Sequence, residues 1–437
     1  MNRTHLSFVI CLLSFSDLVA QTPWSLRQCI DYAVEHNISV KQQELNVKNQ
    51  EVTLSTAKNS RLPNLSASAS ENLGFGRGLT MDNTYANHNT QSTSFTLGTD
   101  APLYTGGQIS NQIKQDKLNL QAALAELDRA KESVSMQVVA AYLDAVYQRD
   151  LVAVSERQCE LSKTQARRIE ILYQNGKTSE AELAEAQAHV AADLLELTRQ
   201  QNTAMLALLE LTQLLELPSP DGFDIHQPEA YDPSAVMLAA PDAIYAEALG
   251  IKPQIQAGEL NVKSAERGVR IAQAGYYPSL HFSAGMGSSY YKTSGFKAAS
   301  FGKQMEDNFN QSLGVSLSVP IFNRFATRNA VRQARLQVSS QQLLLEDTKK
   351  SLYKEIQQAY YNALAVQKQC LSSDAALTAS QTSFNLMEKK YENGKATSTE
   401  YQESKIALQR AEATALQSRY TFLFRHKLLD FYRGVAF

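Results

Sequence analysis

The sequence predicts a mainly α-helical protein with a membrane β-barrel. In this fold class, long helices form a coiled-coil barrel and each protomer contributes four β-strands to a barrel that several protomers share. Three observations predict it: the 437-residue chain repeats itself once, long proline-free segments have helical spacing, and four short runs alternate between apolar and polar residues.

The repeat is the first observation. The pentapeptide ELNVK occurs at 44–48 and again at 259–263, and a proline follows fifteen residues after each copy. Further on, YQNGKTS at 173–179 aligns with YENGKAT at 391–397. A period of more than 200 residues is far too long for a solenoid repeat, so we interpret it as a tandem duplication of one large unit. The predicted organisation is a first repeat at 21–217, a proline-rich linker at 218–241 and a second repeat at 242–437.

The helical segments are the second observation. No proline lies between residues 103 and 217 or between 321 and 437, and these spans are rich in good helix formers. We therefore expect helices at 105–174 and 324–391, each about 100 Å long. Each long helix is expected beside two shorter ones, at 26–61, 178–217, 241–276 and 397–432. Asn175-Gly176 and Asn393-Gly394 are expected to turn one helix into the next, because such turns often need a positive φ.

The alternating runs are the third observation. Period-two patterns predict strands at about 64–75, 91–103, 279–291 and 309–321, with polar loops at 76–90 and 292–307 between them. Each run has the length of a tilted transmembrane strand, although an ordinary soluble hairpin is the alternative. The prolines at the ends of these runs are expected to mark the junctions between strands and helices: Pro63, Pro102, Pro278 and Pro320. Four strands are too few to close a membrane barrel, so we expect an oligomer.

Composition and motifs exclude several function classes. Residues 1–20 read as a secretory signal peptide, with Arg3 before a short apolar stretch. Lys plus Arg is 42 and Asp plus Glu is 44, so no strongly basic face is available for nucleic acid. The three cysteines beyond the signal peptide are expected to be buried free thiols: Cys29, Cys159 and Cys370. No metal-binding or phosphate-binding motif is found, so we expect no enzyme activity and no cofactor. An exported structural coiled-coil protein remains the alternative, although a coiled-coil rod does not require paired strands.

Local motifs resemble those of the TolC family of outer-membrane efflux channels. WSLRQCIDYAVEHN at 24–37, with Ser25 and Gln28 as a capping box, resembles the family's opening helix. AKNSRLPNLS and AQAGYYPSLHFS resemble its helix-to-strand junctions, and APLYTGGQISNQIKQ and VPIFNRFATRNAVRQAR its strand-to-helix junctions. The resemblance implies a homotrimer in the outer membrane of a Gram-negative bacterium, with a 12-stranded barrel (four strands from each of three chains) in contact with outer-membrane lipid. It also implies a periplasmic adaptor and an inner-membrane pump of RND or ABC type, in a tripartite efflux or type I secretion system.

The same resemblance assigns roles to residues at the two tips. The turns are expected to contact the adaptor through Asn175, Gly176, Lys177, Thr178, Asn393, Gly394 and Lys395. The periplasmic gate is expected at Glu182, Tyr391, Glu400 and Glu403. The sequence departs from well-known members at Ala396, where they carry an arginine. Glu400 and Glu403 are three apart and share a helical face, which by itself fits a solvated surface; near a threefold axis they would form a cation-attracting ring.

Overall fold

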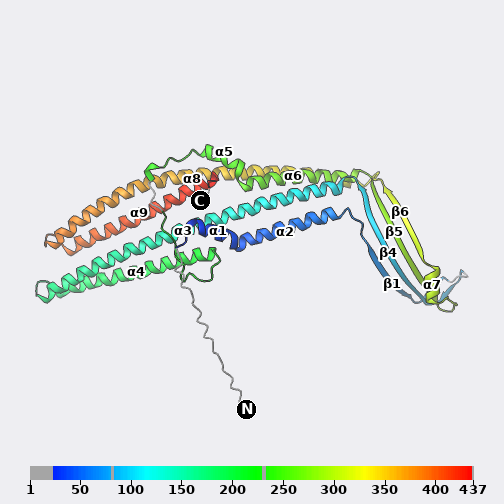
Figure 1. The fold of residues 1–437 in the computed structure, drawn as a ribbon, viewed down its shortest axis with the longest axis horizontal. Helices are drawn as coiled ribbons and strands as arrows, with labels where there is room; N and C mark the ends of the chain where they lie inside the picture. The colour runs from blue at the N-terminus through cyan, green and yellow to red at the C-terminus, as the bar shows by residue number, and fades with distance from the viewer. Residues whose placement is uncertain (1–22, 80–82, 229–232, 436–437) are drawn as a thin grey trace, which may run out of the picture.

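The computed structural model describes residues 23–79, 83–228 and 233–435. The molecule is elongated, with a β-sheet at one end and the tips of two helical hairpins at the other (Figure 1). The predicted signal peptide lies outside the described residues. Within the described residues, no helix combines the length and the apolar character needed to cross a membrane.

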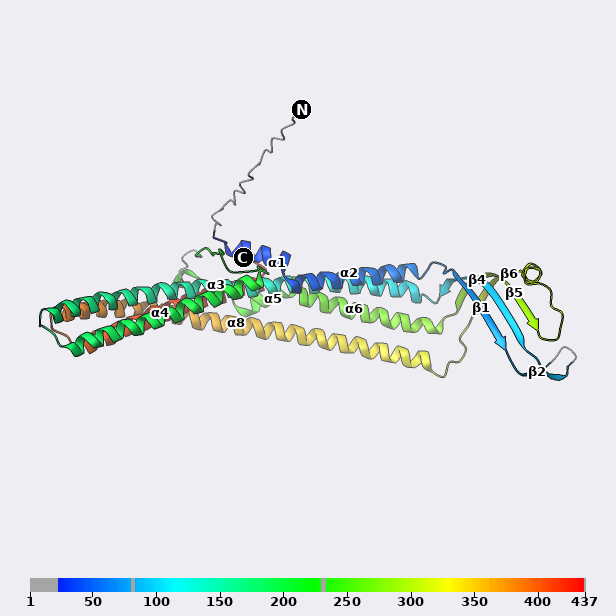
Figure 2. The same cartoon turned by 90° about the horizontal axis from the view of Figure 1, so that it is seen from below.

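Two long helices run most of the distance between the sheet and the tips. These are α3 (Gln108–Gln174) and α8 (Ala326–Glu392), each 67 residues, or about 100 Å at 1.5 Å per residue. Each is followed by a helix of 35 residues that returns antiparallel: α4 (Glu180–Leu214) after α3, and α9 (Ser398–Tyr432) after α8. Figure 2 shows α4 beside α3 along the length of the first hairpin, and Figure 1 shows the second hairpin, α8–α9, running in the same direction. The predicted mainly helical fold class is confirmed.

The remaining helices are shorter than expected because each predicted segment is broken. The segment 26–61 forms α1 (Leu26–His36) and α2 (Ile38–Asn59), and the segment 241–276 forms α5 (Pro241–Ile251) and α6 (Pro253–Gln273). Asn37 ends α1 and caps α2, because its Oδ1 accepts the Ser39 N–H at 2.9 Å. Pro253 breaks the second segment, since it cannot donate a backbone hydrogen bond and it restricts Lys252 to an extended conformation.

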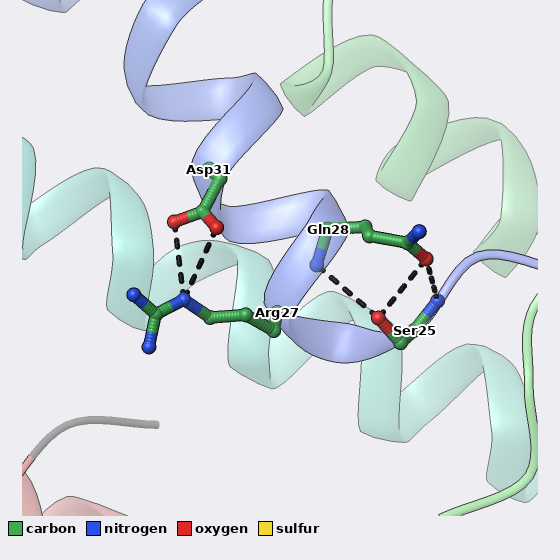
Figure 3. A network of polar contacts seen from close by, with 4 residues as sticks. All are labelled: Ser25, Arg27, Gln28 and Asp31. Carbon is green, nitrogen blue, oxygen red and sulfur yellow. Dashed lines mark hydrogen bonds and ion pairs between the residues drawn. The ribbon is translucent and has the colours of Figure 1, made fainter.

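The predicted capping box at the start of α1 is confirmed. Gln28 N–H donates to Ser25 Oγ at 3.3 Å, and Ser25 N–H donates to Gln28 Oε1 at 2.8 Å. Figure 3 shows this pair beside the ion pair between Arg27 and Asp31, whose Nε–Oδ2 distance is 3.1 Å. Two backbone N–H groups that the helix leaves unpaired are satisfied in this way.

A four-stranded antiparallel sheet joins the two halves of the chain. Its order is β1 (Ser66–Gly74), β4 (Thr90–Thr105), β5 (Ser279–Thr293) and β6 (Asn310–Ser318). The central pair β4–β5 links the first half to the second, and β1 and β6 are the edge strands. The predicted four strands are therefore present. β1 and β6, each nine residues long, have no second neighbour among the described residues.

Two details of the strand region differ from the sequence prediction. Pro102 lies inside β4 instead of at its end, at an irregularity where the register shifts between Pro102 and Tyr104, since proline cannot complete the ladder. The strand continues to Thr105, and Gly106 and Gly107 make the junction with α3. Pro63, Pro278 and Pro320 lie in the connections outside the strands.

The predicted polar loops also contain regular structure. The segment 76–90 includes a small hairpin of β2 (Arg77–Leu79) and β3 (Tyr85–Asn87). The segment 292–307 includes α7 (Phe301–Asp307), which Ser300 caps by accepting the Lys303 N–H at 3.4 Å. Polar composition alone did not reveal these elements, because both are short and lack a clear apolar period.

The main hydrophobic core lies midway along the molecule, where α1, α3 and α4 meet the linker. Tyr142 is buried there, and its hydroxyl donates to the His226 carbonyl at 2.5 Å. Trp24 and Phe223 pack edge to face, 5.4 Å between ring centroids. The expectation of buried free thiols is confirmed for Cys29, Cys159 and Cys370. This core fixes the helices whose far ends form the tips.

Candidate functional site at the helical tips

Both hairpin turns depend on a glycine in the left-handed conformation. Gly176 has φ 70° and Gly394 has φ 69°. In the first turn, Lys177 N–H donates to the Leu172 carbonyl at 2.9 Å; in the second, Lys395 N–H donates to the Lys390 carbonyl at 2.8 Å. These are Schellman-type helix ends. No atom lies within 4 Å of a Cβ built on either glycine, so the requirement is for the positive φ and not for space.

The returning helices start with side-chain caps. Ser179 Oγ accepts the Glu182 N–H at 3.2 Å at the start of α4. At the start of α9, Thr397 and Glu400 form a full capping box, in which Glu400 Oε2 accepts the Thr397 N–H at 2.7 Å and its hydroxyl at 2.9 Å. These hydrogen bonds from the Thr397 backbone and hydroxyl hold the pKa of Glu400 below its usual value. This helix-capping role of Glu400 was not predicted from the sequence, although Thr-x-x-Glu is its typical signature.

A cleft of ≈ 560 Å³ separates the tips of the two hairpins. Five of the predicted site residues line it: Lys177, Thr178, Glu182, Tyr391 and Gly394. Glu400 and Glu403 are exposed on α9 and are not among the residues that line the cleft, and neither are Asn175, Gly176, Asn393 and Lys395. The structure thus separates the predicted residues into a group that lines the cleft and a group that lies outside it.

Direct contacts hold the two hairpins together across the cleft. Gln165 Nε2 donates to the Tyr391 hydroxyl at 2.8 Å, and Arg168 Nη2 donates to the Glu392 carbonyl at 2.7 Å. Tyr391 also stacks on Tyr401, with 4.9 Å between ring centroids. Burial raises the pKa of Tyr391, and it raises the pKa of Tyr401 to about 12, so both hydroxyls stay protonated at neutral pH.

Ala396 also lines the cleft, and no cation reaches across from that position. At the cleft, an arginine crosses between the hairpins from the opposite side, as Arg168 of α3. Ser398 adds a hydrogen bond to Glu185 of α4 at 3.2 Å. The contacts between hairpins therefore exist here without an arginine at position 396.

A buried ion pair above the cleft was not predicted from the sequence. Lys405 Nζ lies 2.5 Å from Asp193 Oδ2 and 2.5 Å from Ser162 Oγ, and Ser162 donates to Asp193 at 2.6 Å. These three residues come from α9, α4 and α3. The spacing of Tyr401, Lys405 and Leu408 places Lys405 on the buried stripe of α9, which was the available signal.

Long antiparallel helical hairpins on a short antiparallel sheet define the class of outer-membrane efflux channels. The family model described as "Outer membrane efflux protein" matches residues 29–216 and 244–426, so the chain belongs to the outer membrane efflux protein family. The predicted family is therefore confirmed, together with the outer membrane as location and efflux as the transport function.

Individual relatives are similar in sequence to this chain over most of its length. The outer membrane efflux protein BepC of Brucella suis biovar 1 (strain 1330) is 22% identical over 427 residues, which cover 94% of this chain and 88% of BepC. The outer membrane protein TolC of Escherichia coli (strain K12) is 22% identical over 361 residues, which cover 80% of this chain and 72% of TolC. The fold is similar to the crystal structure of the Campylobacter jejuni CmeC outer membrane channel, with a TM-score of 0.76, 17% identity and coverage of 94% and 86% of the two chains.

Proposed function

We propose that three copies of this chain form one channel, in which the sheets join into a 12-stranded barrel (three times four strands) and the hairpins form a tunnel into the periplasm. The observation that carries this proposal is the sheet itself. Its edge strands β1 and β6 have equal length and leave their outer backbone groups without a partner among the described residues. Open edges are not tolerated in lipid, and pairing β6 of one copy with β1 of the next removes them.

The proposed channel receives substrates from a periplasmic adaptor and an inner-membrane pump of RND or ABC type, in an efflux or type I secretion system. The chain reaches the outer membrane by export through residues 1–20, and 21–217 and 242–437 act as duplicated halves joined by the linker 218–241. The chain itself carries no catalytic step in this proposal, because the pump supplies the energy.

The cleft between the hairpin tips is proposed as the periplasmic gate. Glu182 and Tyr391 line it, and the contacts of Tyr391 with Gln165 and of Arg168 with Glu392 favour a closed arrangement. Opening requires the hairpin α8–α9 to move away from α3–α4, which breaks these hydrogen bonds. Glu400 and Glu403 are exposed on α9 and are proposed to form the acidic ring at the entrance.

The test combines mass and conductance. Native mass measurement of the detergent-extracted protein should give three chains, and the same material should form ion-conducting pores in planar lipid bilayers. A stable single chain in lipid would contradict the proposal, as would trimers that never conduct under any applied voltage.

A further inference from the structure

The sheet has one apolar and one polar face. Along β5 the apolar side chains are Leu280, Phe282, Ala284 and Met286, and the intervening residues His281, Ser283, Gly285 and Gly287 are polar or small. The register carries the apolar face across the sheet, because Leu97 pairs with Met286 and Val315 pairs with Phe282. Paired residues share a face, so apolar side chains of neighbouring strands form one continuous band.

Helix α7 lies on this apolar face. Ser288 Oγ donates to the Met305 carbonyl at 2.7 Å, and the rings of Tyr290 and Phe301 lie 5.3 Å apart. Ser288 and Tyr290 are two and four residues beyond Met286, and side chains with this spacing point to the same side of a strand. In the proposed barrel α7 therefore lies outside the wall, and not in the lumen.

Helix α7 is also fixed to the edge of strand β5, at the part of that edge which β6 does not reach. β6 ends where Asn310 pairs with Gly287, but β5 continues to Thr293. Along this extension, Gln304 accepts the Tyr291 N–H at 2.9 Å and donates to the Tyr291 carbonyl at 3.1 Å. Asn308 donates to the Ser289 carbonyl at 2.6 Å. Side chains of α7 and its C-cap thus pair backbone groups that the shorter β6 leaves open.

The apolar band ends at the level of α7. Glu71 and Thr93 pair across β1 and β4 on the apolar face, and Thr93 pairs in turn with Tyr290. The Glu71 carboxylate accepts hydrogen bonds from Thr93 Oγ1 and, at 2.8 Å, from Gln91 Nε2. A charged side chain is costly in hydrocarbon, so this level marks the edge of the lipid core. It is the end of the sheet far from the long helices α3 and α8 (Figure 1).

The exposed surface of α7 and its C-terminal flank is aromatic on one part and charged on another. Phe301 is 48% exposed and Phe309 is 52% exposed, and both flank the turn that carries Lys303. Lys303 Nζ pairs with Asp307 at 2.9 Å, which leaves little net charge for an anionic partner. Amphipathic segments with exposed aromatic rings favour the membrane interface.

We propose that α7 is an interfacial helix that lies against the outer leaflet of the outer membrane, with Phe301 and Phe309 at the boundary between headgroups and acyl chains. The inference rests on the proposed function, because it takes the apolar face to meet lipid. The occupant is lipid and not a second copy of the chain, because the aromatic surface continues the apolar band. Burial of aromatic area holds the segment there, and charge contributes little.

Depth-dependent fluorescence quenching tests this position. The chain has one tryptophan, so Trp24→Phe gives a silent background into which single tryptophans are placed. The full-length protein is reconstituted in phosphatidylcholine vesicles brominated either near the carbonyl end or near the methyl end of the acyl chain. Phe301→Trp and Phe309→Trp should each lose most of their emission with the shallow bromines and less with the deep ones.

Two matched controls use the same strand. Ser289→Trp lies at the level of α7 on the polar face and should be quenched by neither lipid, and Phe282→Trp lies within the apolar band and should be quenched. If Phe282→Trp is quenched but both α7 variants are not, the inference is wrong. If the α7 variants are in addition shielded from aqueous iodide, a neighbouring copy covers α7, which also overturns it. If Ser289→Trp is quenched and Phe282→Trp is not, the assigned faces are reversed and the proposed barrel itself fails.

Discussion

Lys405 Nζ and Asp193 Oδ2 lie 2.5 Å apart and join the two helical hairpins. The pair sits roughly two helical turns from the start of α9. The Lys405 side chain is only 4% exposed and the Asp193 side chain 21% exposed. Removal of one partner from a buried ion pair leaves the other uncompensated, which costs more than the pair contributes. Because Lys405 and Asp193 come from different hairpins, this cost falls on the proposed closed arrangement, in which the hairpins are together.

We therefore predict that Lys405→Met favours the open channel. The closed arrangement should lose about 2 kcal/mol, less than for a fully buried pair because Asp193 still meets solvent. The ratio of closed to open channels should fall roughly 30-fold, since 1.4 kcal/mol corresponds to a tenfold change. Single-channel recordings in planar bilayers measure this ratio.

Two further variants control that experiment. Lys389→Met removes an exposed lysine near the same tip and should leave the recordings unchanged. Lys405→Met combined with Asp193→Leu should recover much of the closed population, because no buried charge is then left unpaired. A double variant as open as the single one would show that the ion pair is not what holds the hairpins.

Tyr391→Phe should weaken the closed arrangement more modestly. The variant keeps the ring stacked on Tyr401 and removes only the hydroxyl that accepts from Gln165. Loss of one such hydrogen bond costs about 1 kcal/mol, or roughly a fivefold shift toward the open channel. Tyr173→Phe, at an exposed position on α3, is the matched control. An equal ratio of closed to open channels for both variants would exclude Tyr391 from the gate.

The glutamates of α9 predict a pH-dependent block. Glu400→Gln retains the capping box, because glutamine at the same position can still accept from Thr397, so this change tests charge alone. Together with Glu403→Gln it should remove block by a trivalent cation added from the periplasmic side and weaken cation selectivity. Measured reversal potentials that stay unchanged would place these residues away from the entrance.

The pH dependence of that block follows from the capped carboxylate. Hydrogen bonds from Thr397 hold the pKa of Glu400 below its usual value, so its charge persists while pH falls through the ordinary range of glutamate, near ~4.3. The hydrogen bonds to Glu400 stabilise the folded protein at pH values above the unfolded-state pKa of this carboxyl group. This stabilisation is lost only as the pH falls through the lower pKa that the group has in the folded protein. Block by the trivalent cation should therefore persist in Glu403→Gln, which keeps Glu400, as the pH falls through the ordinary range of glutamate.

The sequence predicted the long helices, the four strands and the turns because their signals are repeated over many residues. The breaks at Asn37 and Lys252 were missed, since a cap residue and a single proline interrupt an otherwise continuous helical composition. Lys405 was missed because lysine usually lies on a solvated face, and its partners come from two other helices. Helix α7 was missed because contacts with β5, and not its own apolar period, hold it.

The exposed turns predict separable effects on stability and on export. Gly394→Ala should destabilise the hairpin by about 1 kcal/mol because alanine disfavours φ 69°, although no atom would clash with its Cβ. Gly394→Asn should cost less, since asparagine tolerates the left-handed region.

Lys395→Trp keeps the turn backbone and adds bulk where the adaptor is proposed to bind, so it should abolish export while the amount of trimer in the membrane stays normal. Lys297→Trp, at an exposed position beside the sheet at the opposite end, should leave export intact. Cells that carry Lys395→Trp and export normally would show that this turn does not contact the adaptor.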